Sequence, residues 1–162
     1  MVYVMEFYVD GGCRRNGYSE AMGAAACCLM QRGHGSYFHK SVHLPQDPTP
    51  TNQRAEITAI ILALRWALEK YEELHSNPSL DVRIYSDSRY AIGCMNTWID
   101  KWVRNGWVNS SGNEVANRDL IEQASDLEEE VMELGSVSYR WIPRSDNQLA
   151  DRHCNEELDE QE

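Results

Sequence analysis

Long hydrophobic runs are absent from this sequence of 162 residues. The longest apolar stretch, residues 21–30, is about half of the roughly 20 residues that a helix needs to span a bilayer, and it better fits a buried strand. The N-terminus also lacks a basic segment followed by an apolar core, so no secretory signal is indicated. We therefore expect an intracellular protein, in the cytoplasm or nucleus, with no membrane partner.

Cysteine and histidine are sparse, with five of each, and neither shows the spacing of a metal-binding motif. The cysteines are Cys13, Cys27, Cys28, Cys94 and Cys154. Their odd number and the expected reducing compartment argue against a disulfide framework, and we interpret most of them as small buried apolar residues. The histidines at positions 34, 39, 43 and 75 fall in expected strands, turns or a helix end, without ligand spacing.

Basic residues are outnumbered, 15 against 26 acidic ones, and the net charge of −11 at first argues against a nucleic-acid partner. The acids are unevenly distributed, however. Residues 119–133 hold seven acids and residues 156–162 hold five, with no base in either run. Without these twelve, fourteen acids face fifteen Lys and Arg residues, so one face can still meet phosphates. We interpret the two runs as a solvated helix face and a disordered tail.

The length and the pattern of apolar residues indicate one α/β domain with a mixed sheet and helices on its faces. We assign residues 1–156 to this domain and residues 157–162 to an acidic tail. Expected strands lie near residues 2–9, 21–30, 36–44, 82–86 and 137–142. A glycine-bearing turn over 11–17 follows the first, and a turn at Gly33-His34-Gly35 separates the next two. Helices are expected over about 52–74, in two or three short segments after residue 87, and from about 147.

Four acids stand where stability alone explains a carboxylate poorly: Asp10, Glu56, Asp87 and Asp151. Asp10 and Asp87 each follow an apolar strand pattern, and Asp151 opens the last helix. Glu56 lies on the apolar stripe of its helix, where either a bound metal or the helix N-terminus would favour a negative charge. Strand ends meet at one edge of an α/β sheet, and clustered carboxylates repel unless cations neutralise them. The pattern predicts a divalent-metal site.

Five motifs occur in an order and spacing similar to those of type 1 ribonuclease H. They are Tyr8–Gly12 with Asn16-Gly17, Thr51–Glu56, Tyr85–Ser88, Trp98–Trp107 and Asn147–Asp151. The resemblance covers about residues 5–156, and the segment Trp98–Trp107 resembles the substrate-binding handle of the cellular enzymes. It implies a ribonuclease H-like fold, with a five-stranded mixed sheet flanked by helices.

The resemblance also implies an activity. Enzymes of this family are endonucleases that hydrolyse the RNA strand of RNA–DNA hybrids by a two-metal-ion mechanism. The four acids would be the catalytic residues and would hold two Mg²⁺ ions, with Mn²⁺ as a possible substitute and Asp10 bridging both. The expected partner is the hybrid duplex, and a monomer with no obligate protein partner is expected. The alternatives are an inactive nucleic-acid-binding domain and an integrase- or resolvase-type DNA nuclease on the same fold.

Residues matching the family's substrate contacts fall into two groups near the acids. Asn16, Asn52 and Gln53 match groups that read 2′-hydroxyls in the minor groove, the feature that distinguishes RNA from DNA. Thr51 and Asn117 match a pocket that binds a DNA phosphate away from the cut. Threonine 49 stands where that pocket usually has an arginine, so we expect a weaker phosphate contact.

The handle and the loop before Asp151 depart from the common family pattern. Trp102 is the candidate for the DNA-strand channel with Tyr90 as a second wall, while tryptophans 98 and 107 are expected to be structural. Family handles are commonly lysine-rich, whereas the aromatic stretch here has Lys101 and Arg104. The connection 143–147 is short and lacks the family's loop histidine, and histidine 153 is expected to point elsewhere. Arg144 either contacts the scissile phosphate or is a surface residue.

Overall fold

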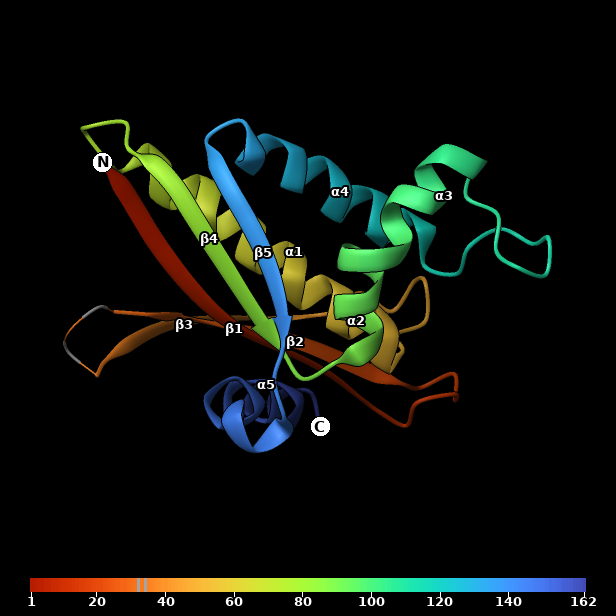
Figure 1. Cartoon of the computed structure of the whole chain (residues 1–162). Coiled ribbons are helices and arrows are strands. Elements are labelled where there is room, and N and C mark those ends of the chain that lie inside the picture. The colour runs from red at the N-terminus through yellow and green to blue at the C-terminus, as the bar shows by residue number, and fades with distance from the viewer. Residues whose placement is uncertain (32, 34) are drawn as a thin grey trace.

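The computed structural model describes residues 1–31, 33 and 35–162 and has a five-stranded sheet in the order β3-β2-β1-β4-β5 (Figure 1). The strands are β1 (Val2–Arg14), β2 (Met22–Met30), β3 (Tyr37–His43), β4 (Ser79–Ser86) and β5 (Gly135–Trp141). The first three form an antiparallel meander, whereas β4 is parallel to both β1 and β5. The predicted mixed sheet is therefore confirmed. Histidine 34, in the turn expected between β2 and β3, lies outside the described residues.

In the described part of the chain, five α-helices connect and cover these strands. They are α1 (Asn52–Glu72), α2 (Arg89–Gly93), α3 (Ile99–Asn105), α4 (Arg118–Met132) and α5 (Gln148–Gln161). A wide π-type turn, η1 (Cys94–Trp98), joins α2 to α3, and a 3₁₀ turn, η2 (Arg144–Asp146), precedes α5. In Figure 1, α1 and α4 lie on one side of the sheet and α5 on the other. Among the described residues, no helix is long and apolar enough to cross a membrane.

The main core lies between the sheet and α1, because β1 alternates its side chains between two faces. Met5, Phe7 and Val9 are buried on the α1 side. They join the apolar stripe of α1, of which Ile60 and Leu64 are fully buried. A separate, smaller cluster lies between the sheet and α5, formed by Ala24, Ala26, Cys154 and Leu158.

The cysteines have the role that their pattern predicted. All five are free thiols, and four of them are buried. Cys13 is half-buried and is the member nearest to solvent. They act as small apolar residues in this fold.

The glycine segment after Asp10 corrects the prediction of a turn at that point. Strand β1 continues to Arg14, with Gly11 paired to Ala25 of β2. A Cβ atom at Gly11 would lie 2.2 Å from the backbone carbonyl of Ala55 in α1. The glycine is therefore needed because α1 packs directly on the strand, and Asp10 lies inside the strand rather than at its end.

The expected acidic tail is also corrected, because α5 continues through residues 157–161. Leu158 is buried against the sheet. Arg14 forms ion pairs with Asp159 and Glu162, and Gln161 Nε2 donates to the Gly23 carbonyl at 3.0 Å. The acidic run therefore belongs to a docked helix, because its side chains contact residues of β1, β2 and β3.

Candidate active site

The four predicted acids line one cavity of about 360 Å³ beside β1 and the end of β4, two interior strands of the sheet. Asp10 comes from the middle of β1 and Glu56 from the first turns of α1. Asp87 follows β4 directly, and Asp151 lies in the first turn of α5. Segments far apart in the sequence thus place four carboxylates together, although Asp10 lies inside its strand and not after it as the sequence predicted.

Burial and the neighbouring carboxylates disfavour the ionised forms of Asp10 and Glu56. The pKa of Asp10 is raised to about 8, first by burial and then by the charges of Asp87 and Asp151. A hydrogen bond with Asp151 acts in the same direction, whereas Arg144 lowers the pKa. Burial and Asp87 also raise the pKa of Glu56, against the effect of a hydrogen bond from Ser88. Full ionisation of Asp10 and Glu56 is therefore unfavourable in the protein alone and would be favoured by a bound cation.

Hydrogen bonds hold two of the acids in position. The Ser88 hydroxyl donates to Glu56 and also accepts from the Ala91 N–H, so it caps α2 at the same time. Asn147, which is 1% exposed, donates from Nδ2 to the Val9 carbonyl at 2.9 Å and to Asp87 Oδ2 at 3.3 Å. These contacts fix carboxylate directions before any ligand binds.

Sequence reasoning assigned no role to three residues that contact this site. Ser88 and Asn147 lie inside the motifs that carry two of the acids, so their position was a usable signal. Trp141 Nε1 donates to the Asp87 carbonyl at 3.0 Å, and the Arg89 guanidinium lies 3.8 Å from the centre of its ring. No local pattern predicts this contact, because it joins residues 54 positions apart.

Arg144 lies at the rim of the acid cavity. Its side chain is 79% exposed and donates to Asp151 Oδ1 at 3.3 Å. The sequence left two roles open, a contact with the scissile phosphate or a surface residue, and the observed side chain is exposed and lies beside the acids. The contact with a phosphate stays a prediction.

The donor set fits hard divalent cations. All four candidate ligands are carboxylates, and no histidine is among the residues that line this cavity. Oxygen ligands suit Mg²⁺ and Mn²⁺, whereas imidazole and thiolate favour other metals. The raised pKa of Asp10, which burial causes first and the charges of Asp87 and Asp151 second, is consistent with this, because a bound cation would relieve the charge repulsion.

The amides expected to read 2′-hydroxyls lie at the junction of β1 and α1. Asn16 Oδ1 accepts from the Asn52 N–H at 3.1 Å, and Asn52 Oδ1 accepts from the Cys13 N–H at 2.9 Å. Asn16, Asn52 and Gln53 are all exposed. The two asparagines use their oxygens within the protein, which aligns their NH₂ groups as donors toward solvent.

The two residues predicted to bind a DNA phosphate have partners within the protein. Thr51 caps α1 by accepting from the Arg54 N–H at 3.1 Å. Asn117 Nδ2 donates to the Tyr90 hydroxyl at 2.9 Å, and its Oδ1 accepts from Arg54 at 3.4 Å. Arg54 also forms a two-pronged ion pair with Asp119, at 2.9 and 2.7 Å. Arg54 therefore ties Thr51 and Asn117 together, which the sequence did not indicate.

The handle, Trp98–Trp107, holds three tryptophan rings in a row. Trp102 lies between the other two, with ring centres 6.0 Å from Trp98 and 6.2 Å from Trp107. Trp107 is buried, as expected for a structural residue. Trp98 contacts Gly93 on one side but is 40% exposed, so it is also open to a ligand. Exposure therefore does not single out Trp102 as the channel residue.

The basic residues of the handle face solvent. Lys101 and Arg104 are both exposed on α3. The Arg104 Nε–H donates to the Asp100 carbonyl at 3.2 Å. Both side chains are available to phosphates, but the region holds few positive charges.

His153 points away from the acids, as predicted. Its Nε2 lies 2.8 Å from the Tyr37 hydroxyl and its Nδ1 lies 2.7 Å from Glu156. Its ring also stacks on His39. The loop before α5 is reduced to the short turn η2, so no histidine replaces the loop histidine at the cavity.

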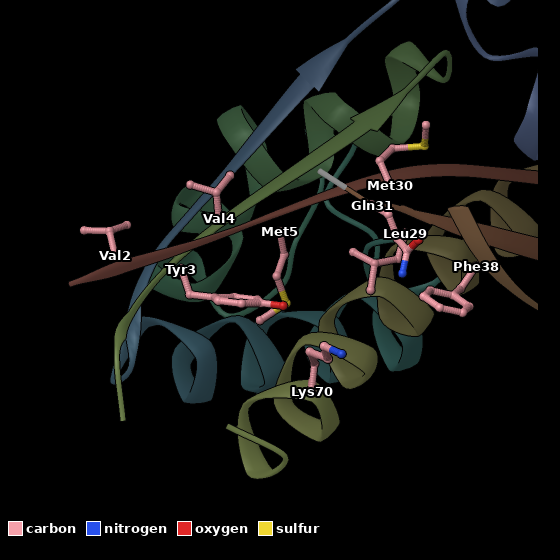
Figure 2. A pocket seen from close by; sticks show the side chains of 9 residues that line it. All are labelled: Val2, Tyr3, Val4, Met5, Leu29, Met30, Gln31, Phe38 and Lys70. Carbon is pink, nitrogen blue, oxygen red and sulfur yellow. The ribbon is translucent and has the colours of Figure 1, made fainter. Parts of the chain in front are cut away.

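Another hollow, of about 290 Å³, lies at the opposite end of β1 from the acids (Figure 2). Tyr3 and Met5 of β1, Phe38 of β3 and Lys70 of α1 are among the residues that line it. Among the residues that the structure describes, no acid and no histidine lines it. It therefore offers no rival site for metal-dependent chemistry.

Comparisons with known proteins agree with this geometry. A family model described as RNase H matches residues 3–159. A ribonuclease H of Schizosaccharomyces pombe is 41% identical over 120 residues, covering 74% of this chain but 40% of the yeast protein. A ribonuclease H of Clostridium botulinum is 30% identical over 158 residues, and the match covers 94% of each chain. The chain belongs to the RNase H family.

Solved structures show the same fold. An RNase H1 from the archaeon Halobacterium salinarum has a TM-score of 0.64 at 22% identity, with coverage of 98% of this chain and 99% of that one. A foamy viral protease-reverse transcriptase in complex with dsDNA has a TM-score of 0.73 at 22% identity, with coverage of 96% and 94%. The predicted family, fold and enzyme class, a type 1 ribonuclease H, are thereby confirmed.

Proposed function

We propose that this chain hydrolyses the RNA strand of RNA–DNA hybrids by two-metal-ion catalysis at the four-acid cavity. The observation that carries the proposal is the convergence of four carboxylates in one cavity, those of Asp10, Glu56, Asp87 and Asp151. The exposed, positively charged Arg144 lies beside them. Relatives named ribonuclease H over nearly the whole chain support the same activity.

The four carboxylates would hold the ions, which are Mg²⁺ or Mn²⁺ by the chemistry of the donors. When bound, two such ions would supply an activated water and stabilise charge on the attacking and leaving oxygens. The protein's own part is to fix the carboxylates. Ser88 holds Glu56 and Asn147 holds Asp87, so neither has to be oriented when the substrate arrives.

Strand choice would come from Asn16, Asn52 and Gln53. Their exposed amide donors lie beside the cavity, since Asn52 itself lines it. A 2′-hydroxyl can accept from such donors, whereas a deoxyribose offers no partner. The expected result is cleavage that requires ribonucleotides near the cut.

A monomer would suffice for this activity, because all four acids come from the same chain. The absence of a histidine from the cavity lining also has a consequence. A general acid–base group typically contributes about 10²–10⁴-fold, so we expect slow turnover. Mg²⁺ dehydrates reluctantly and gains more from assisted water exchange, so we expect Mn²⁺ to give the higher rate.

The test is cleavage of matched, end-labelled RNA–DNA, RNA–RNA and DNA–DNA duplexes with Mg²⁺, with Mn²⁺ and with EDTA. We expect cutting of RNA in the hybrid alone, and only with metal. A folded protein that binds the hybrid but cuts nothing would favour the inactive-domain alternative. Preferential cutting of a DNA duplex or four-way junction would favour an integrase- or resolvase-type nuclease.

A further inference from the structure

A second group of metal-ligating side chains lies where the end of β3 meets the last turns of α5. His43 is the final residue of β3, and Glu157 and Glu160 are one helical turn apart on α5. One ring nitrogen and one carboxylate oxygen from each glutamate all lie within 4.8 Å of one another. His43 Nε2 contacts Glu157 directly and lies 4.0 Å from Glu160 Oε2.

We propose that His43, Glu157 and Glu160 form a binding site for a divalent transition metal ion of the Zn²⁺ class, separate from the four-acid cavity. One imidazole and two carboxylates are a ligand set that zinc accepts, with water in the fourth position. Mg²⁺ prefers oxygen ligands throughout, so the two sites differ in the metal they favour.

The present geometry is close to what such an ion requires. Metal–ligand bonds of about 2.0–2.2 Å in a tetrahedron place the ligand atoms roughly 3.3–3.6 Å apart. The observed separations lie on both sides of this range, so small side-chain movements suffice. Glu160 is free to make them, because its side chain is 70% exposed.

The other two ligands are held in place before any metal binds. Ser41 Oγ donates to Glu157 Oε1 at 2.8 Å, while Glu157 Oε2 faces His43. Such an outer-sphere hydrogen bond orients a ligating carboxylate. The backbone of His43 is fixed by its pairing with Ala24 in the sheet, and its half-exposed imidazole is positioned by the contact of Nε2 with Glu157.

The surrounding charges favour a cation. In the described part of the chain, Glu157 and Glu160 have no basic ion-pair partner except His43, because Arg14 pairs with Asp159 and Glu162 instead. A bound cation would compensate two carboxylates at once. The competing explanation is a simple ion pair between a protonated His43 and Glu157, which needs no metal.

Binding at this site would connect α5 to the sheet. The apolar cluster beneath α5 is small, and the helix also carries Asp151. A metal shared by β3 and α5 would therefore stabilise the docking of the helix. The three ligands span residues 43 to 160, which is why no spacing in the sequence indicated them.

The experiment is a Zn²⁺ titration, by calorimetry and by competition with a chromophoric chelator. The parent protein is the full chain with Asp10→Asn and Asp87→Asn. These substitutions weaken Zn²⁺ binding at the four-acid cavity, so that it contributes little to the titration. Five proteins are compared in excess Mg²⁺: this parent, His43→Gln, Glu160→Gln, Ser41→Ala and the control His75→Gln, which alters an exposed histidine in the connection that follows α1. Thermal melting with and without Zn²⁺ reports folding and stabilisation.

We expect the parent and His75→Gln to bind Zn²⁺ and to melt at a higher temperature with it. His43→Gln and Glu160→Gln should each weaken binding by at least about tenfold, and Ser41→Ala by about 10–100-fold. Undiminished binding by Glu160→Gln, whose exposed side chain is not needed for folding, would overturn the proposal. So would a parent that binds no Zn²⁺, since an ion pair alone would then explain the contact.

Discussion

The two faces of the sheet are built from different materials. On the α1 side, Phe7 and its neighbours form one continuous apolar core with α1 and α4. On the α5 side, the apolar cluster has four residues, of which Leu158 is the one large side chain. Polar contacts such as Arg14–Asp159 and Tyr37–His153 surround this cluster. Val9 and Asp10 are adjacent in β1, yet one belongs to the core and the other to the acid cavity. Side chains that stabilise the core and a side chain of the proposed catalytic site thus alternate along the same strand.

The largest expected effect on stability is on the α1 side. Phe7 is fully buried and its ring lies 5.8 Å from that of Trp66. Phe7→Ala should lower the free energy of unfolding by about 3–5 kcal/mol, because it opens a cavity in a continuous core. Leu158→Ala on the α5 side should cost less, since fewer apolar neighbours surround it. Urea unfolding of both variants measures the difference, and equal losses would remove the contrast between the faces.

Substitution in the acid cavity should lower the rate of cleavage and leave the free energy of unfolding largely unchanged. Asp87→Asn should lower the rate of hybrid cleavage at least about 100-fold, because it removes a proposed metal ligand held by Asn147. Ser88→Ala, which removes only the hydrogen bond to Glu56, should cost about 10–100-fold. Single-turnover cleavage measures both, with urea unfolding as the control. Near-parental cleavage by Asp87→Asn would show that the metal assignment is wrong.

The sequence predicted what depends on periodicity and on local motifs. The strands, the apolar stripe of α1 and the four acids all have a local pattern in the sequence, and this pattern predicts them. The continuation of β1 past Asp10 was missed, because it depends on α1 packing against Gly11. The docking of residues 157–161 was missed for a similar reason, since Arg14 and Gly23 supply its partners from far along the chain. Contacts between residues far apart in the sequence produce no regular spacing from which they could be predicted.

The pH dependence of stability offers a smaller test of the same division. The folded-state pKa of Asp10 is raised to about 8, against about 3.9 when unfolded. The folded state then binds more protons between these values, so Asp10 makes the metal-free protein less stable as the pH rises through this window. Asp10→Asn should therefore match the parent near pH 4 and exceed it near pH 8.

The expected gain in the free energy of unfolding for Asp10→Asn is on the order of 1–3 kcal/mol. The upper limit is the full pKa shift of Asp10 multiplied by ~1.4 kcal/mol per pKa unit, and the gain should be smaller because the partner charges relax. Urea unfolding in EDTA across this pH range measures it. Added Mg²⁺ should shrink the gain, since the cation relieves the same repulsion in the parent. A parent whose stability rises steadily up to pH 8 would contradict the role assigned to Asp10.

The handle packs Ile99 and Trp107 into the main core but exposes its basic side chains, and the smallest effect is expected from these. Each phosphate neutralised contributes roughly −0.9 to the slope of log affinity against log salt for B-form DNA. Lys101→Ala/Arg104→Ala should therefore flatten the slope of hybrid binding by up to about 2, whereas Trp102→Ala should weaken binding without changing it, because stacking releases no counterions. Binding is measured by anisotropy in Asp87→Asn protein, with Lys70→Ala at the far end of α1 as the control. An unchanged slope in the double variant would make the handle a structural element and would direct the search for the phosphate path to other basic residues.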